Sequence, residues 1–358
     1  MADTALAESL KVKKFLKDYF VEYVRDSGFK PYMGTGTNSV IQVKRELVSG
    51  GKSIGIPLVT RLKGAGVTGV NTLEGNEEAL GNFEQEIAVE YLRNAVRITD
   101  PDERYSAFSL MQAARDALMN WSMDRLRSDL IEALGSINGL PYATASAAQR
   151  NTWTVANEDR ILFGDSASNY NATHATALDA VTASMTMSAA TLTLMKRIAK
   201  NADPHIRPTR VSNSQGREYF VAFMNSFAFR DLKEDPVMAQ ANREARERGV
   251  DTNPIFQDGD LIYDGVIARE IPEIGSFNNT AATPVELSPV YLCGAQALGI
   301  AWGEEPKRIT DTFDYGIKKG TGVQEVRGIE KLRFPTGNAG AFKDHGLVTG
   351  YVAAAADV

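Results

Sequence analysis

The sequence predicts an α+β fold in which one or two cores carry long segments that extend away from them. Three observations support this prediction. A strand-like excursion of about 60 residues, 39–98, is too long for an ordinary loop inside a compact domain. A strong helical pattern follows it from Asp102 to Leu134, and several apolar, strand-like runs lie after residue 218. The chain of 358 residues is also longer than one core usually organises.

Composition limits the classes of function. Hydrophobic residues make up 43% of the chain and charged residues 23%, which is typical of a globular protein. The formal net charge of -6 argues against a dedicated nucleic-acid-binding domain, because phosphate contacts need clustered Lys and Arg, although a mildly acidic wall around DNA remains compatible. No stretch approaches the roughly 20 apolar residues of a membrane span, and the N-terminus lacks the apolar core of a signal peptide. We therefore expect a protein kept in a reducing cytoplasm, with no membrane partner.

The first two predicted elements lie before the long helix. Residues 9–27 alternate apolar and charged side chains at helical spacing, which predicts an amphipathic N-terminal arm. After Gly28 the pattern changes to strands at 39–47 and 53–62, joined by a turn at 49–52. Another strand-like run at 81–98 brings the chain back. We therefore predict a hairpin or longer ribbon whose residues 39–70 make most of their contacts with an adjacent chain.

The longest helical signal runs from Asp102 to Leu134. Its apolar residues recur at spacings of three and four, so a nearly continuous helix is expected. We predict that Phe108, Met111, Leu118 and Trp121 face a sheet formed by the last strands of the chain.

The next elements alternate between loop, helix and strand. Residues 135–173 are small and polar, which predicts a loop with a short strand around Trp153. A second helix is expected from Ala177 to Asn201, ended by Asp203-Pro204, and a strand from Glu218 to Met224.

The last third of the chain is predicted to be mostly strand. A charged helical run at 230–248 is followed by a strand at 261–271 and by an apolar run, Val290–Trp302, which should be central core. Residues 322–334 and 345–353 are predicted to be paired late strands. Cys293, the single cysteine, allows no intrachain disulfide and is predicted to be a small buried hydrophobe.

Three short motifs could indicate ligand binding or catalysis, but the residues around each of them argue against it. Residues 64–69, GAGVTG, match the dinucleotide fingerprint GxGxxG, but no helix pattern follows, so a flexible hairpin tip is the better interpretation. In Lys318–Gly322 the lysines precede the glycines, which is not the order of a phosphate loop. Glu74, Glu77 and Glu78 could hold a cation, but a solvated loop is favoured.

No other set of residues predicts catalysis or metal binding. His174, His205 and His345 lie far apart in the sequence and none has the spacing of a metal motif. The run at 243–248, REARER, alternates charge and favours a solvated or inter-subunit helix face. We therefore predict no catalytic, cofactor-binding or metal residues, and no cofactor.

Long segments of the sequence resemble, in order, the coat-protein family typified by that of phage N-four. The segments are GAGVTGVNTLEGNEEAL at 64–80, FVAFMNSFAFRDLKEDP at 220–236, RGVDTNPIFQDGDLIYDGVIAREIPEI at 248–274, VYLCGAQALGIAWG at 290–303 and FDYGIKKGTGVQEVRGIEKLRF at 313–334. A final segment, DHGLVTGYVAAAA, also fits. The chain is thereby identified as similar to major capsid proteins of tailed bacteriophages.

The resemblance implies the Hong Kong 97-like (Johnson) fold and its usual parts. These would be an N-terminal arm at 1–38, an extended β-hairpin loop at 39–98, a peripheral domain with a long spine helix at 99–174, an axial domain at 175–312, and a C-terminal return to the peripheral domain at 313–358.

The resemblance also implies function and partners. We expect a structural protein, not an enzyme, that self-assembles into hexamers and pentamers of an icosahedral head around double-stranded DNA, inside the host bacterial cytoplasm. Scaffolding, portal and decoration proteins would be further partners. Two alternatives remain open: a bacterial encapsulin compartment with the same fold, and a nucleotide-dependent enzyme built around Gly64–Gly69. Lys44, Lys52 and Lys63 are available for an isopeptide bond to a neighbour, but nothing singles out a partner, so none is predicted.

Overall fold

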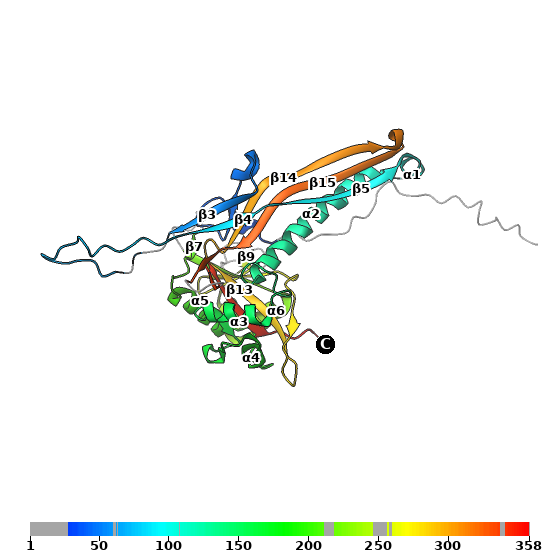
Figure 1. The fold of residues 1–358 in the computed structure, drawn as a ribbon. Helices are drawn as coiled ribbons and strands as arrows, with labels where there is room; N and C mark the ends of the chain where they lie inside the picture. The colour runs from blue at the N-terminus through cyan, green and yellow to red at the C-terminus, as the bar shows by residue number, and fades with distance from the viewer. Residues whose placement is uncertain are drawn as a thin grey trace, which may run out of the picture. The chain divides into compact units, whose positions relative to one another are not determined.

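A computed structural model describes residues 28–357 except 60, 61, 63, 107, 211–217, 246–255, 258–259 and 337–340. The described chain divides into two compact units (Figure 1). The smaller unit contains residues 91–126 and 304–326, and the larger unit contains 28–90, 127–303 and the residues from 327 onward. The predicted helix at 9–27 and residues 246–248 of the charged run at 243–248 lie outside the described residues.

The larger unit is built on a mixed sheet whose central strands are buried on both faces. Strand β13 (Glu286–Cys293) lies between β18 (Leu347–Ala353) and β8 (Glu218–Met224), antiparallel to both. All seven residues of β18 are buried, as expected for a strand covered on both sides. The remaining strands of this sheet are β6 (Ile161–Phe163), β7 (Thr209–Arg210), β9 (Phe256–Gln257), β10 (Asp260–Tyr263), β11 (Val266–Glu270) and β12 (Phe277–Asn278).

Short helices cover this sheet and form two cores with it. The helices are α3 (Ala147–Ala156), α4 (His174–Asp179), α5 (Ala189–Asn201), α6 (Ser226–Glu234) and α7 (Pro236–Ala245). Helix α5 packs on β18 and α6 on β13 (Figure 1). Leu192 and Met195 of α5 belong to the core that contains Phe220 of β8. Trp153 of α3 belongs to a separate core with Tyr351 of β18. The sheet therefore connects two apolar clusters.

Strand β2 (Ile41–Lys44) belongs to the body of the larger unit rather than to the ribbon. It pairs in parallel with β14 (Leu298–Phe313), from Leu298↔Ile41 to Ala301↔Lys44, and with the short β1 (Met33–Gly34). Val40 and Ile41 are buried. The prediction that 39–47 forms a hairpin with 53–62 is therefore wrong. The period-2 pattern identified a strand but carried no information on its partner.

The ribbon itself consists of two later strands. Strand β3 (Ser53–Val59) pairs antiparallel with β4 (Asn82–Ala88), from Ser53↔Ala88 to Val59↔Asn82. The described residues of 60–81 between them form no strand or helix. A short 3-10 helix, η3 (Glu46–Ser49), stands between β2 and β3. The predicted return of the chain at 81–98 is confirmed as β4 and β5 (Glu90–Thr99).

The smaller unit contains parts of two predicted elements, the long helix at 102–134 and the late strand at 322–334. Helices α1 (Asp100–Tyr105) and α2 (Leu110–Gly135) are separated, so the expected continuous helix is broken. Ser106 is extended, and Ser109 Oγ accepts the N–H of Gln112 at 3.3 Å and so begins a new helix. Strand β15 (Lys318–Lys331) lies between β14 and β5 in the sheet order.

The face of α2 predicted to meet the late strands is partly buried. Leu118 is buried, whereas Phe108, Met111 and Trp121 are half-buried. Ser122, on the same side of the helix as Leu118, donates a hydrogen bond to Glu325 of β15 at 3.4 Å. The predicted direction of this face is therefore supported by a contact within the smaller unit.

Three further predictions need correction. The helix expected at 177–201 is two helices, α4 and α5. The loop expected around Trp153 contains helix α3, which begins with a complete capping box at Ser146. The strand expected at 261–271 is the hairpin β10–β11, which turns at Asp264 and Gly265, both with positive φ. In the first and third of these cases, a turn that a single sequence signals only weakly divides an apolar run.

The late strands do not pair with one another as predicted. Strand β18 pairs with β13 and β6, and β15 lies in the other sheet. The short strands β16 (Arg333–Pro335) and β17 (Phe342–Asp344) form a separate antiparallel pair. By contrast, β8 has the predicted bounds, and the run Val290–Trp302 is largely buried, although it forms two strands. No helix among the described residues is long and apolar enough to span a membrane.

Candidate assembly surfaces

Exposed apolar side chains are concentrated outside the body of the larger unit. Among the described residues, eighteen large hydrophobic side chains are exposed, and six of them lie on the ribbon or its loop. These six are Val59, Leu62, Val70, Leu73, Leu80 and Phe83. Nine others belong to the smaller unit: Tyr91, Val96, Tyr105, Met119, Met123, Ile309, Phe313, Tyr315 and Ile317. Such gathering of exposed apolar groups marks interaction surfaces.

The loop between β3 and β4 is almost completely exposed. Every described residue of 64–80 except Val67 is exposed, and Val70 has no shielding at all. Its own polar groups fix local turns, because Glu78 accepts the backbone N–H of Gly64 at 2.5 Å and Glu77 that of Gly75 at 2.7 Å. The GAGVTG motif thus lies in a loop after a strand, as predicted, and the acidic residues hold loop backbone.

The base of the ribbon, unlike its loop, is attached to the larger unit. Ile54 and Ile56 pack against a small core that contains Ile87. Gln85 of β4 donates to the carbonyl of Lys331 at 2.9 Å and accepts the N–H of Arg333 at 2.7 Å. The ribbon is therefore held at one end by side chains of its own subunit, while the other end has no core.

The segment before β2 is anchored on the sheet of the larger unit. Phe29 is fully buried, with its ring centroid 4.8 Å from that of Phe223 on β8. Thr209 Oγ1 donates to the carbonyl of Asn38 at 2.6 Å, and the N–H of Gln296 to that of Ser39 at 2.8 Å. The described residues from Phe29 to Ser39 are therefore fixed on this sheet.

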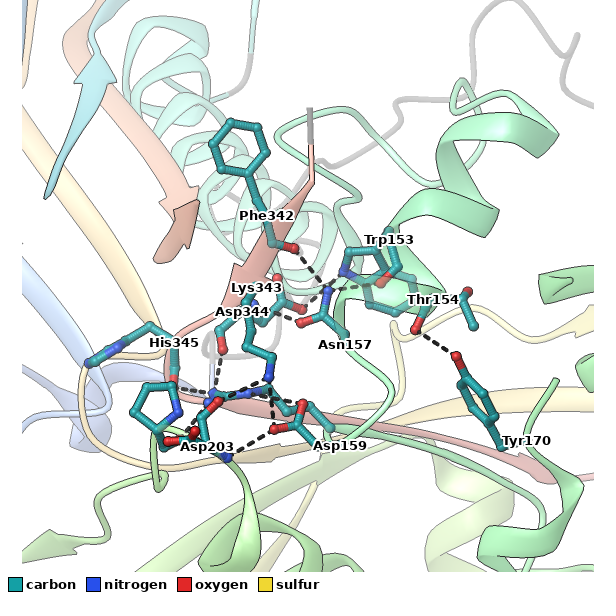
Figure 2. A network of polar contacts seen from close by, with 12 residues as sticks. Trp153, Thr154, Asn157, Asp159, Tyr170, Asp203, Phe342, Lys343, Asp344 and His345 are labelled. Carbon is teal, nitrogen blue, oxygen red and sulfur yellow. Dashed lines mark hydrogen bonds and ion pairs between the residues drawn. The ribbon is translucent and has the colours of Figure 1, made fainter. Parts of the chain in front are cut away.

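A buried polar network joins α3 to the last strands of the larger unit (Figure 2). Asp344 lies at its centre, with Oδ2 accepting from Lys331 Nζ at 3.0 Å and from Trp153 Nε1 at 3.3 Å. The Lys331 ammonium also lies 5.3 Å from the centroid of the Trp153 ring. Asn157 accepts the N–H of Asp344 at 2.8 Å and donates to the carbonyl of Phe342 at 3.0 Å. These contacts compensate a charge pair that would otherwise be costly to bury.

Arg160 extends this network to the chain around Pro204. Its guanidinium is buried and donates to the carbonyls of Asp344, His345 and Pro204. Nearby, Lys343 Nζ lies 2.9 Å from Asp159 Oδ2. Figure 2 marks this ion pair with a dashed line. Three segments distant in sequence are thereby held together. We interpret the network as structural, because its groups bind one another.

The three histidines do not form a site. His174 is buried between Tyr142 Oη at 3.0 Å and Thr154 Oγ1 at 2.9 Å, whereas His205 is exposed. Burial, assisted by Arg150, lowers the pKa of His174 to about 4. Burial, with Arg160 and Arg207, lowers the pKa of His345 likewise to about 4. Among the described residues no group of three potential metal ligands occurs.

Cys293 is fully buried, as the sequence predicted. Burial raises the pKa of its thiol well above the ordinary value, so thiolate is scarce. Lys318–Gly322 forms part of strand β15, not a loop. Lys44 lies on β2 and Lys52 is exposed just before β3, while Lys63 lies outside the described residues.

Sequence reasoning missed two features of this molecule. The buried network around Asp344 left no signal, because its members come from segments far apart in the chain. The turn at Asp314–Gly316 did leave one, since an Asp-Tyr-Gly triplet between two strand-like runs is typical of a hairpin.

Comparison with known proteins supports a single interpretation of these features. A family described as phage capsid protein matches residues 3–356. The major capsid protein of Pseudomonas phage KPP25 is 31% identical, over 94% of this chain and 93% of that protein. The capsid structure of cyanophage Pam1 has a TM-score of 0.89 at 41% identity and covers 100% of both chains. The capsid of Ralstonia phage GP4 has a TM-score of 0.75 at 21% identity, again over 100% of both, and supports the fold.

The fold defines a shell protein of the Hong Kong 97-like (Johnson) type, with helices and sheets of the α+β class. The chain belongs to the phage capsid protein family, and its role is that of a structural major capsid protein. The resemblance drawn from the sequence is therefore confirmed.

Proposed function

We propose that this chain forms hexamers and pentamers that close into an icosahedral head around double-stranded DNA, after assembly in the cytoplasm of the host bacterium. The observation that carries the proposal is the loop between β3 and β4, with exposed Leu62, Val70, Leu73 and Leu80 and no core of its own. Two strands alone are marginal in water, and an exposed apolar ribbon invites aggregation unless a partner covers it. A neighbouring copy supplies that cover in a shell.

The proposed domains follow the prediction from the sequence, with one change at the ribbon. We assign an N-terminal arm to 1–38, a peripheral domain to 99–174, an axial domain to 175–312 and a peripheral return to 313–358. Within the extended loop, 39–98, residues 40–47 belong to the body, because β2 is buried beside β14. The inter-subunit part is therefore the ribbon from β3 to β4.

The shell role needs no catalytic residue, cofactor or metal, and we propose that this chain is not an enzyme. Scaffolding, portal and decoration proteins are proposed partners, and DNA is a neighbour without specific contacts. The net charge of -6 is consistent with the absence of specific DNA contacts, because an acidic chain attracts DNA phosphate only weakly.

Electron microscopy of the expressed chain tests the proposal directly. Icosahedral or capsomer-sized particles are expected, and a uniform small monomer would contradict it. Packaged DNA in particles from infected cells separates a phage head from a cargo-enclosing encapsulin compartment. Tight, saturable binding of nicotinamide or adenine nucleotides would instead favour an enzyme built around Gly64–Gly69.

A deletion locates the assembly contact. Replacing residues 60–81 by a two-residue Asn-Gly turn leaves β3 and β4 paired and removes exposed loop. We expect an unchanged urea midpoint for the unassembled subunit and loss of particles. A matched deletion of Val40–Leu62 removes β2 and is expected to unfold the subunit, because that strand is core.

A further inference from the structure

A pocket of the larger unit lies beside the C-terminal end of α2. Its walls come from that helix end, from the chain that follows it, and from strands β12, β13 and β18. The cavity volume is about 280 Å³, whereas about 15 Å³ is enough to hold one water molecule. Six of the lining residues carry a ring and define what we call the ring pocket: Pro141, Tyr142, Phe277, Pro289, Tyr291 and Tyr351.

The aromatic rings of the ring pocket form one continuous wall. The ring centroid of Tyr142 lies 5.4 Å from that of Phe277 and 6.4 Å from that of Tyr351, and the last two centroids are 6.1 Å apart. The hydroxyl of Tyr142 is hydrogen-bonded to His174 at 3.0 Å, and the Arg150 guanidinium lies 4.5 Å from its ring centroid. A partner therefore meets a preformed wall, which lowers the entropy cost of binding.

Two buried hydroxyl groups of the ring pocket have no hydrogen-bond partner among the described residues. They belong to Tyr291 and Tyr351, which are 5% and 3% exposed. Buried polar groups are nearly always paired, so both hydroxyls are unusual and cost stability. A Cβ at Gly135 would lie 2.9 Å from Tyr291 Oη, so this hydroxyl lies against the pocket lining at the end of α2. Burial raises the pKa of both phenols, and each therefore keeps a proton to donate.

The edge of the ring pocket is negatively charged. Glu132 lines it, is exposed, and makes no ion pair with another described residue. No Lys or Arg occurs among the described residues that line this pocket. A partner that brings a positive charge to the edge therefore gains a complementary contact, and an acidic partner is repelled.

We propose that the ring pocket binds a proline-rich segment of a partner protein, in the polyproline II conformation and with a basic residue beside the prolines. Proline rings pack on the aromatic wall, the basic residue meets Glu132, and the two phenols donate to backbone carbonyls of the segment. A polyproline II segment leaves its carbonyls free, whereas most carbonyls of a helix are already bonded. The inference goes beyond the shell function, because the partner is not a second copy of this chain.

Fluorescence anisotropy of the unassembled subunit with synthetic peptides tests the pocket. The probe is a fluorescein-labelled oligoproline peptide that ends in two arginines. We expect saturable binding, and about tenfold weaker binding when the arginines are replaced by glutamates or the prolines by alanines. Equal binding of the alanine peptide would show attraction of charge alone and overturn the proposal. Particles from a chain that does not bind the probe would overturn the pocket and leave the shell function in place.

Tyr291→Phe separates binding from stability. It removes an unpaired hydroxyl and keeps the ring, so the subunit should unfold at an equal or higher temperature, while affinity for the probe falls about threefold to tenfold. Tyr142→Phe is the comparison for stability, because its hydroxyl is paired with buried His174 and its loss should lower the unfolding temperature. Unchanged affinity in Tyr291→Phe contradicts the proposal.

A bulky residue at the edge of the pocket locates the binding. Ala143 lines the pocket and is exposed, so Ala143→Trp can block it without disturbing a core, and probe binding should fall by about tenfold or more. Ala148 is also exposed but does not line this pocket, and Ala148→Trp should bind the probe normally. Equal binding by the two variants would place the peptide elsewhere and overturn the proposal.

A photo-crosslinker distinguishes a partner segment from a second copy of the chain. Cys293 is fully buried, so a benzophenone maleimide should react with Ala143→Cys alone. Irradiation of the labelled subunit should join it to the proline–arginine probe, identified by mass spectrometry. A crosslink from Ala143→Cys to a second copy of this chain in assembled particles would assign the pocket to a contact between copies and overturn the proposal.

Discussion

Two strands of this chain have opposite surroundings. β18 buries all seven of its residues, whereas the last nine residues of β14, 305–313, are all exposed. Both are regular strands, so the difference does not concern secondary structure. It separates a part of the chain that stabilises the single subunit from a part whose side chains are left largely open to solvent by the subunit. A shell protein must have surfaces that its own subunit leaves exposed, because the contacts between copies are made there.

The same division appears between the network around Asp344 and the loop of the ribbon. In the network, polar groups are buried and mutually bonded, whereas in the loop, apolar groups are exposed and unprotected. Substitutions in the first region should therefore change the free energy of unfolding, and those in the second should change assembly. Four predictions test this division, from the largest expected effect to the smallest.

Asp344→Ala is expected to destabilise the unassembled subunit by about 3 to 5 kcal/mol, because it leaves the Lys331 ammonium buried without its partner. Urea unfolding measures the loss. The matched control is Lys343→Ala in the next position, where the pair with Asp159 is partly exposed and about 1 kcal/mol is expected. If both substitutions lowered the free energy of unfolding by the same amount, the buried network would contribute no more to stability than the partly exposed pair beside it.

Trp153→Ala is expected to cost about 3 to 5 kcal/mol, because the ring is only 1% exposed and fills a core. Trp121 on α2 is half-buried, so Trp121→Ala should cost roughly 2 kcal/mol in the unassembled subunit. Thermal unfolding of both variants gives the ranking. A larger loss for Trp121 would mean that the smaller unit contributes more to subunit stability than its exposure indicates.

Acid should destabilise the subunit through its buried histidines. The pKa of His174 is lowered to about 4 in the folded state, whereas the unfolded chain takes up the proton near 6.5. Between these values the unfolded state binds more protons, so stability falls as pH drops from about 6.5 to 4. Each such histidine contributes roughly 3 kcal/mol to this loss.

Unfolding measured across that pH range checks the effect of His174. His174→Gln removes the titrating group and should flatten the slope. A slope that persists in His174→Gln at its full size would assign the acid sensitivity to other groups.

The smallest effect on stability is expected in the loop of the ribbon. Leu73→Ser replaces a side chain that is 61% exposed, so the free energy of unfolding should change by less than about 0.5 kcal/mol. Particle yield should nevertheless fall, because the apolar contact with a neighbour is lost. Leu140→Ser on the larger unit, at 39% exposure, is the control with unchanged assembly. Normal particles from Leu73→Ser would exclude this residue from the interface.

The sequence by itself determined the α+β class, the bounds of β8, the burial of Cys293 and the family. The periodicity of apolar residues predicted the strands and the burial. The family followed from segments that resemble it in the same order over most of the chain. It did not determine which strands pair. Ile41 lies beside Leu298, more than 250 residues away, and the pattern of β2 would suit any partner.

Tertiary structure also decided where helices break and where charges are buried. Ser106 ends α1 although apolar spacing continues, because serine side chains offer the backbone other hydrogen bonds. Lys331 and Asp344 look like ordinary surface residues in the sequence, and become a buried pair once β15 and β17 meet near Trp153. Tyr315 is strained only because the turn of β14 into β15 imposes a left-handed backbone. Such features depend on contacts between segments that lie far apart in the sequence. A local residue pattern carries no information about those contacts.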